Sequence, residues 1–356
     1  MSLETCSSKS PDNITRRSAI ATTGAALTAL SVFGSPSAAR SDPTKIRYAT
    51  GGGIGPNETE TLIFLPYLEK NVLKNFGRAY ELEMTFTRGT PEAAQLLAAG
   101  QADLATLSSA AFALSVIKDA VPGGLTIISD NFQENHPGNA TNGFFVNADS
   151  PLKRVEDLRG KKIAVNAFGS AVDLTCRVVL RKHGLDPRND VEIVEIGFPN
   201  IAAAIRTGRV DCGCLVLPFM AVEDAKDGLR ELFSDADAFG PASVIFQVAS
   251  TTFLKAHPEA VRAFLADYVT GLQWYYNRAN RARALEVVSE LTKSPIPVLN
   301  SYLMTSKDYY RNRNGCVFPP AIQTPIDAMV SEKFIPQRVE AAKYIDLAYL
   351  PHPCRA

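Results

Sequence analysis

The residues best suited to bind a small molecule lie in four short loops of small residues, each placed directly before a helical pattern. These loops are residues 52–55, Gly89 with Thr90, Ser108 with Ser109, and Gly169 with Ser170. Backbone N–H groups at the start of a helix lack intrahelical partners, so together with the helix dipole they attract anions without any cationic side chain. Each loop alone is also an ordinary strand-to-helix connection. Four of them at the carboxyl ends of strands favour one shared cleft for an anion.

The sequence carries none of the spacings typical of a catalytic site. It has no Gly-x-Ser-x-Gly elbow, no His-Glu-x-x-His zinc motif and no phosphate loop ending in Gly-Lys-Ser/Thr. The glycine loop at residues 51–56 follows a strand, but its spacing differs from that of a dinucleotide loop and Pro56 would disrupt the turn. The four histidines stand singly. We therefore expect neither an enzyme nor a bound cofactor or metal.

The cysteines suggest structural roles. Cys212 and Cys214 are too close together for a zinc knuckle and favour a buried strand with two small side chains. Cys316 and Cys354 both lie in the Pro-rich C-terminal section, where an exported chain can form a disulfide. The sequence gives equal weight to a bridge and to free thiols at these two positions.

Residues 1–39 have the order of regions found in an export signal. Arg16 and Arg17 precede a mildly apolar run over residues 19–33, and small residues lead up to Ala39. We expect cleavage near Ala39 and a periplasmic product. The paired arginines favour the twin-arginine pathway, whereas Ala19 stands where that motif usually has Phe and leaves the general secretory pathway open.

Alternating strand and helix patterns place the four loops in an α/β architecture. The first half predicts strands at residues 45–50, 82–86 and 103–107, with helices at residues 59–73, at 90–100 and after Ser109. The second half predicts strands at residues 162–165 and 191–196, with helices at residues 171–183 and 198–208. The remainder predicts a strand at residues 243–249 and helices at residues 256–276, 281–292 and 327–333.

The two halves follow one plan. Gly100 and Asp103 align with Gly208 and Asp211, and the segment starting at Lys45 aligns with the one starting at Lys162. A helix-terminating glycine shortly before a strand is common in α/β proteins, so the matching order of elements is the stronger indication.

Composition excludes several classes of protein. The 356 residues include 37 Lys+Arg and 37 Asp+Glu, without the basic clusters that nucleic-acid binding requires. With 46% hydrophobic residues the chain can bury a core, and its length suggests about two domains. No uninterrupted apolar run long enough to span a membrane follows residue 40.

Several segments resemble one family of proteins: residues 96–103, 150–152, 157–165, 168–170, 208–211 and 257–259. The most specific is residues 157–165 together with Gly169 and Ser170. The chain resembles, over about residues 45–300, the periplasmic solute-binding proteins of ABC importers. The branch it resembles includes the sulfonate, taurine and nitrate receptors and the thiamine-precursor-binding NMT1/THI5-like proteins.

This resemblance implies a two-lobed α/β fold of the periplasmic-binding-protein type II class, with a helical C-terminal section. Each lobe would be a mixed, mostly parallel sheet flanked by helices. Lobe one would combine residues 45–144 with residues 247–356, and lobe two would be residues 145–246, with crossovers near residues 143–147 and 244–248. The lobes would close on a ligand between them.

The resemblance also implies the ligand contacts. Lobe one would contribute Gly53, Ile54, Gly89, Thr90, Ser108 and Ser109, and lobe two Phe168, Ser170, Ala171, Phe198, Pro218 and Phe219. Backbone and hydroxyl donors would hold an acidic head group, and the three phenylalanines would enclose an apolar body. Arg88 is either a partner for a ligand carboxylate or a solvated surface residue.

The implied function is that of a monomeric exported receptor, which delivers a small organic anion to an ABC permease and its ATPase in the inner membrane. Residues 214–218 read Cys-Leu-Val-Leu-Pro where the sulfonate and taurine receptors have a Trp. This favours an aromatic carboxylate over an alkanesulfonate and leaves aliphatic carboxylates open. The alternative is an enzyme on the same fold acting on a small carboxylate or pyrimidine, which the export signal argues against. A receptor that signals to a membrane sensor is a third reading.

Overall fold

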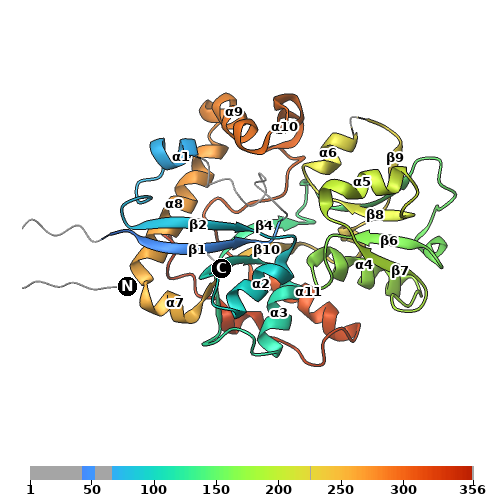
Figure 1. Ribbon diagram of the computed structural model, residues 1–356, viewed down its shortest axis with the longest axis horizontal. Helices are drawn as coiled ribbons and strands as arrows, with labels where there is room; N and C mark the ends of the chain where they lie inside the picture. Colours follow the sequence, from blue (N-terminus) through green and yellow to red (C-terminus); the bar gives the residue numbers. More distant parts are fainter. Residues whose placement is uncertain (1–41, 53–65, 225, 355–356) are drawn as a thin grey trace, which may run out of the picture. The chain divides into compact units, whose positions relative to one another are not determined.

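Two five-stranded sheets form the framework of the computed structural model, which describes residues 42–52, 66–224 and 226–354 (Figure 1). The first sheet has the order β2-β1-β3-β10-β4, with strands Tyr80–Phe86, Thr44–Thr50, Leu104–Leu107, Ala242–Ser250 and Leu125–Glu134. The second has the order β7-β6-β8-β5-β9, with strands Glu192–Glu195, Lys162–Val165, Cys212–Leu215, Gly143–Asn147 and Leu229–Ser234. The predicted α/β class with two similar halves is confirmed.

Both sheets are mixed in the same way. In the first, β1 pairs in parallel with β2 and β3, whereas β10 is antiparallel to β3 and β4. In the second, β6 pairs in parallel with β7 and β8, whereas β5 is antiparallel to β8 and β9. One strand of each sheet therefore runs against the other four, as expected for mostly parallel sheets.

The register of the strands corrects the alignment of the two halves. Tyr48 lies opposite Leu104 in the first sheet, and Ile163 lies opposite Cys212 in the second. Arg47, not Lys45, is thus the counterpart of Lys162. The backbone N–H of Arg47 donates to Asp103, and that of Lys162 donates to Asp211, each over 2.9 Å. The aspartates of the two aligned Gly-x-x-Asp segments therefore accept equivalent backbone hydrogen bonds from the neighbouring strand in both sheets.

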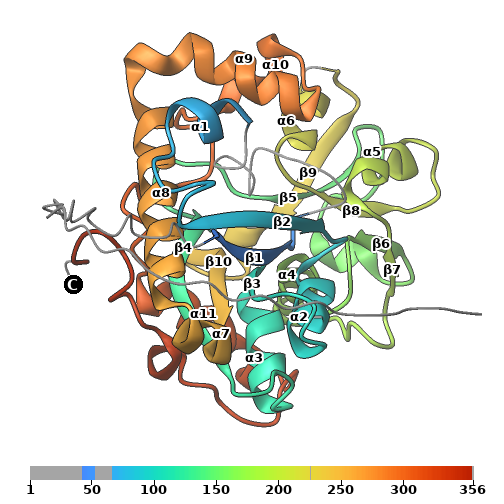
Figure 2. The ribbon, with the colours of Figure 1, turned by 60° about the vertical axis from the view of Figure 1, so that its left-hand side comes forward.

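Helices cover the faces of both sheets (Figures 1 and 2). Those of the first half and of the middle section are α1 (Pro66–Asn71), α2 (Thr90–Ala98), α3 (Ser109–Ile117), α4 (Ala171–Lys182), α5 (Phe198–Arg206) and α6 (Phe219–Asp224). The later ones are α7 (Thr251–Ala256), α8 (Pro258–Tyr276), α9 (Arg281–Thr292), α10 (Ile296–Tyr302) and α11 (Pro319–Ser331). Side chains alternate across β1, so Tyr48 packs toward Phe264 of α8 while Ala49 joins the cluster with Ala93 of α2.

Two helix boundaries differ from the prediction. The helix expected at residues 256–276 is two helices, α7 and α8, separated at His257. The residue before a proline is disfavoured in helical geometry, and Pro258 can begin a helix because its missing N–H is not needed there. Helix α11 begins at Pro319 and not near residue 327, because prolines at its start are tolerated for the same reason. The first part of the helix expected at residues 59–73 lies outside the described residues, as does the leader at residues 1–39.

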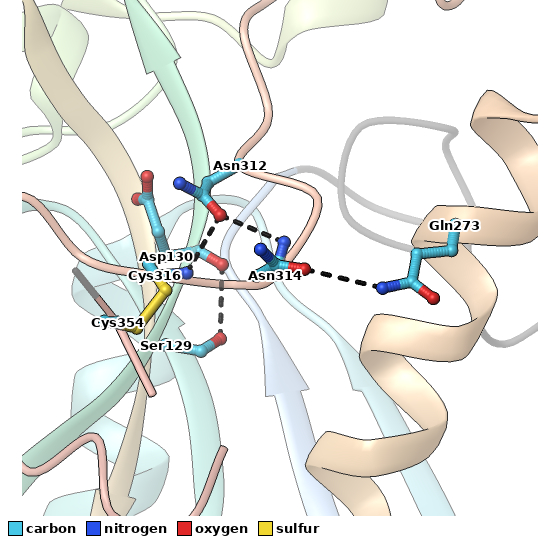
Figure 3. Close-up of a disulfide and its surroundings, with 7 residues drawn as sticks. All are labelled: Ser129, Asp130, Gln273, Asn312, Asn314, Cys316 and Cys354. Carbon is cyan, nitrogen blue, oxygen red and sulfur yellow. Dashed lines mark hydrogen bonds between the residues drawn. A yellow bond between two sulfur atoms is a disulfide. The ribbon is translucent and has the colours of Figure 1, made fainter. Parts of the chain in front are cut away.

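The cysteines divide into one disulfide and three buried thiols. Cys316 and Cys354 form a disulfide with 5.6 Å between their Cα atoms, which settles the alternative left open by the sequence. The loop before Cys316 is attached to β4, because the carbonyl of Gly315 accepts from the N–H of Asp130. It is attached to α8, because Gln273 donates to Asn314 (Figure 3). Cys212 and Cys214 are buried in β8, as predicted.

The chain passes between the sheets twice. Residues 135–142 connect β4 to β5, and residues 235–241 connect β9 back to β10. These two connections also touch each other, because the N–H of Asp235 donates to the carbonyl of Asn142 over 3.0 Å. Within the described part of the chain, no helix has the length and apolarity needed to cross a membrane.

Candidate functional site

A cavity lies where loops that follow strands of the first sheet meet loops of the second. It holds about 480 Å³ of space free of protein atoms, part of it open to solvent. Its lining is Gly51, Gly52, Thr90, Phe132, Asn142, Asn166, Ser170, Ala171, Val172, Phe198, Val216, Leu217, Val244, Ile245 and Tyr309. We call this space the main cavity.

The predicted ligand contacts are divided among the main cavity, two neighbouring cavities and positions outside all three. Thr90, Ser170, Ala171 and Phe198 line the main cavity. Gly89, Phe168 and again Phe198 line an adjoining, more open cavity that also includes Arg88 and Glu195, and Ser109 and Ala171 line a small cavity beside the connections. Ser108, Pro218 and Phe219 line none of these cavities, although Val216 and Leu217, just before Pro218, line the main one. Gly53 and Ile54 lie outside the described residues.

Thr90 is held in place by the start of the next helix. Its Oγ1 lies 2.9 Å from Oγ of Ser108, which also accepts from the N–H of Ala111 over 3.2 Å and so caps α3. Ser108 is therefore a buried support for Thr90. Close packing continues at Gly51, where a Cβ would lie 2.5 Å from Thr90 Cγ2.

Asn166 connects the two sides of the main cavity. Its Oδ1 accepts from the hydroxyl of Ser170 over 2.9 Å, which fixes the cap of α4. Its Nδ2 donates over 3.3 Å to the carbonyl of Arg88, which follows β2 of the first sheet. Asn166 thus joins the two sheets while lining the main cavity.

Gly89 allows the two sides to approach this closely. Its φ of 178° is extended backbone that any residue adopts, so the conformation does not require glycine. A Cβ there would lie 2.9 Å from Nδ2 of Asn166 and 3.1 Å from Cβ of Ala167. Glycine is needed at this position for space.

The helix N-termini differ in how much positive potential they leave for a ligand. At α4, Asp173 accepts from the N–H of Gly169 over 2.8 Å and pairs with Arg177 at 2.7 Å, so its own carboxyl group serves this terminus. Burial raises the pKa of Asp173. Helix α2 has Glu92 in its first turn, whereas α3 has no acidic residue there. Helix α5, which begins at Phe198 of the main cavity, also has no acidic residue in its first turn. Of the helices that begin at the main cavity, α5 is therefore the one least neutralised by the protein's own acids.

No charged side chain is among the described residues that line the main cavity. Arg88 points to the more open cavity with its side chain 69% exposed, and it pairs with Glu92 at 3.2 Å. This agrees with the interpretation of Arg88 as a solvated surface residue. Nor do the described residues include a group of three or more His, Cys, Asp or Glu arranged to hold a metal ion.

Two aromatic residues that form one wall of the main cavity were not predicted from the sequence. Phe132 and Tyr309 stack with ring centroids 4.7 Å apart. The hydroxyl of Tyr309 donates to Oδ1 of Asn142 over 2.5 Å and accepts from the N–H of Leu217 over 2.8 Å. These residues come from the end of β4, a connection and the C-terminal section, where no local pattern marks them. Asn166 could have been found as a polar residue directly after a strand.

Three comparisons relate the chain to known proteins. The family model described as NMT1/THI5 like matches residues 76–282, which is more than half of the chain. A Bacillus subtilis protein named for binding aliphatic sulfonates is 31% identical over 42% of this chain and 44% of its own length. The nitrate/nitrite-binding protein NrtA of Synechococcus elongatus is 37% identical over 20% of this chain and 18% of its own. The chain thus matches less than half the length of these relatives.

Solved structures establish the fold. The alkanesulfonate-binding protein SsuA from Xanthomonas axonopodis pv. citri, bound to MOPS, superimposes with a TM-score of 0.64 at 18% identity, covering 85% of this chain and 98% of that one. The periplasmic nitrate-binding protein NrtA from Synechocystis PCC 6803 gives 0.66 at 13% identity, covering 86% and 87%. The described chain has the fold of the periplasmic binding proteins.

Proposed function

Because this chain belongs to the NMT1/THI5-like family, we propose that it is the substrate-binding protein of an ABC importer. It captures a small organic anion between lobe one (residues 45–144 with 247–356) and lobe two (residues 145–246) and delivers it to the permease and its ATPase. The observation that carries the proposal is the main cavity, which is lined by loops of both sheets and by Asn166, whose side chain bonds from one sheet to the other. A ligand held there would bridge the two lobes and favour their closed arrangement.

The ligand combines an anionic head with an apolar body. The head lies between Thr90, which lines the main cavity, and the start of α5, whose first turn has no acidic residue. The body packs on the Phe132–Tyr309 stack, Phe198 and the aliphatic side chains of the lining. Sulfonates and aromatic or aliphatic carboxylates have this form, and the relatives are named for sulfonate and nitrate binding.

The protein is exported and acts as a periplasmic monomer in this proposal. The leader over residues 1–39, cleaved near Ala39, provides the route. The Cys316–Cys354 disulfide supports an oxidising compartment, because such bonds are rare in the cytosol. No catalytic step is assigned to the chain.

A thermal-shift screen of the mature protein tests the proposal, with sulfonates, aromatic and aliphatic carboxylates, nitrate and pyrimidines as probes. A ligand at 100 times its Kd stabilises the folded state by about 2.7 kcal/mol, which is a clear shift in Tm. The variant Thr90→Val keeps the shape of the side chain and removes its hydroxyl, so the shift should shrink. Thr207→Val, at an exposed helix end that does not line the main cavity, is the matched control. No shift with any anion, or conversion of a bound compound to a product, would overturn the proposal.

A further inference from the structure

Two buried carboxyl groups lie together where the chain crosses between the sheets. Glu134 is the last residue of β4, and Asp235 begins the connection that follows β9. Their residues are 0% and 3% exposed. Both line a small cavity of about 330 Å³ of atom-free space, part of it open to solvent, so β4 and the connection after β9 each contribute one carboxyl group to it.

The carboxyl groups of Glu134 and Asp235 are hydrogen-bonding neighbours of each other, and Asn142 neighbours both of them. None of these neighbours carries a positive charge. Two ionised carboxylates in such a place would be strongly unfavourable, because burial removes water and the charges repel.

The titratable groups that surround the pair supply no positive charge. They are Cys176 of α4, Cys214 of β8, Tyr309 of the C-terminal section and Asp237 of the connection itself. Burial raises the pKa of both thiols and of the Tyr309 phenol, so these groups are neutral. The ammonium group of Lys182 is turned to the carbonyls of Asp237 and Ala238.

Protonation is then the way to relieve the repulsion. Burial and the neighbouring Asp235 raise the pKa of Glu134 well above its usual range. Burial also raises the pKa of Asp235, while the adjacent side chains of Thr175 and Asn142 counteract part of that effect. The pair as a unit therefore keeps a proton to higher pH than an exposed carboxyl group does.

We propose that Glu134 and Asp235 share one proton at neutral pH and so form a pH-sensitive hinge between the two sheets. When that proton leaves to solvent, two carboxylates remain and their repulsion drives the connections apart. The cavity of the pair shares Ala171 and Val244 with the main cavity, so this separation reaches the ligand site. That last consequence, weaker ligand retention at alkaline pH, rests on the proposed function.

Proton linkage tests the shared proton in the unliganded protein. A carboxyl group whose pKa is higher in the folded state loses its stabilising effect as pH rises through that folded value. At pH 7 the wild-type protein should release about one proton more on unfolding than Glu134→Gln does. The slope of the unfolding free energy against pH, from denaturant titrations at pH 6–9, measures this difference. Glu81→Gln, at an exposed position of β2, should leave the slope unchanged. Equal slopes for wild type and Glu134→Gln would overturn the shared proton.

A second readout keeps the test decisive if Glu134→Gln does not fold. Difference infrared spectroscopy of the wild type at pH 7 should show a protonated-carboxyl C=O band that Asp235→Asn alters and Glu81→Gln does not. Absence of any such band in the wild type would overturn the proposal.

Small-angle scattering tests the hinge itself. The radius of gyration of the unliganded wild type should increase between pH 7 and pH 9, and that of Glu134→Gln should not. The same increase in both proteins would overturn the hinge. The denaturant titrations and the scattering measurement both omit ligand. Failure to find any ligand would therefore contradict the proposed function and leave the hinge result standing.

Discussion

Single side chains in this protein act mainly by allowing or preventing close approach of the two sides of the main cavity. Asn166 bonds to the carbonyl of Arg88, and Gly89 provides the space for it. Because the conformation of Gly89 suits any residue, a larger side chain there would push Asn166 away without straining the local backbone.

Gly89→Ala should therefore weaken ligand binding by at least about tenfold, which corresponds to roughly 1.4 kcal/mol. The added Cβ would have to displace the end of the Asn166 side chain and would introduce no backbone strain, so stability should change little. Titration calorimetry with the ligand from the thermal-shift screen measures the affinity. Gly240→Ala is the matched control, since nothing lies within 4 Å of its Cβ. Unchanged affinity in Gly89→Ala would contradict the account.

Asp130 makes stability depend on pH in the acid range. It is buried in β4, bonded to the Ser243 hydroxyl and to Nε2 of Gln133, and burial raises its pKa to about 6 from 3.8. The folded state thus holds this proton more tightly than the unfolded state. The stabilising contribution of Asp130 is therefore fully present below about pH 4 and is lost as pH rises through about 6.

The effect of that shift is roughly 3 kcal/mol, at 1.36 kcal/mol for each unit of pKa. Denaturant titrations of the wild type and Asp130→Asn between pH 4 and pH 7 measure it. The variant cannot titrate at this position, so the difference in its unfolding free energy from wild type should change across this range. A constant difference would show that Asp130 titrates normally.

At the scale of helices and strands, most of the framework could be predicted because its signals are local. Strand β6 matches its predicted residues, and β1, α4 and α9 match to within a residue. The break at His257 was missed because apolar periodicity continues across Pro258. Strands β4 and β9 were not predicted, although β4 carries Phe132, Asp130 and Glu134.

The candidate site could be predicted only in part for the same reason. Thr90, Ser170, Ala171 and Phe198 stand at helix starts, which are recognisable in the sequence, and they line the main cavity. Phe132, Asn142 and Tyr309 come from segments far apart in the chain, and only the tertiary fold brings them together. No pattern in the local sequence predicts that a carboxyl group such as that of Glu134 is buried.

Two parts of the C-terminal section are joined by a covalent link whose effect can be measured. The disulfide spans a sequence separation of 38 residues, and closing a loop of that length stabilises a protein by about 4 kcal/mol in the chain-entropy model. The double variant Cys316→Ser with Cys354→Ser should lose stability of that order. Reductant should destabilise the wild type and leave the double variant unaffected. Equal sensitivity of both proteins to reductant would contradict this role.

For the whole molecule, the two sheets of equal plan and the two connections between them are what the proposed activity requires. Two lobes that move about short connections can enclose a ligand and release it, and binding needs only to favour the closed arrangement. The main cavity, lined from both sheets without a charged side chain among the described residues, is suited to an anion held by neutral donors.

Native mass spectrometry of the mature protein, freshly purified from the periplasm of its producing cells, tests the central claim most directly. The account predicts one small organic anion bound per monomer, released on unfolding with its structure unaltered after prolonged incubation. A ligand that is chemically converted during incubation, or a compound that carries no anionic group, would contradict the proposal of a binding protein for organic anions.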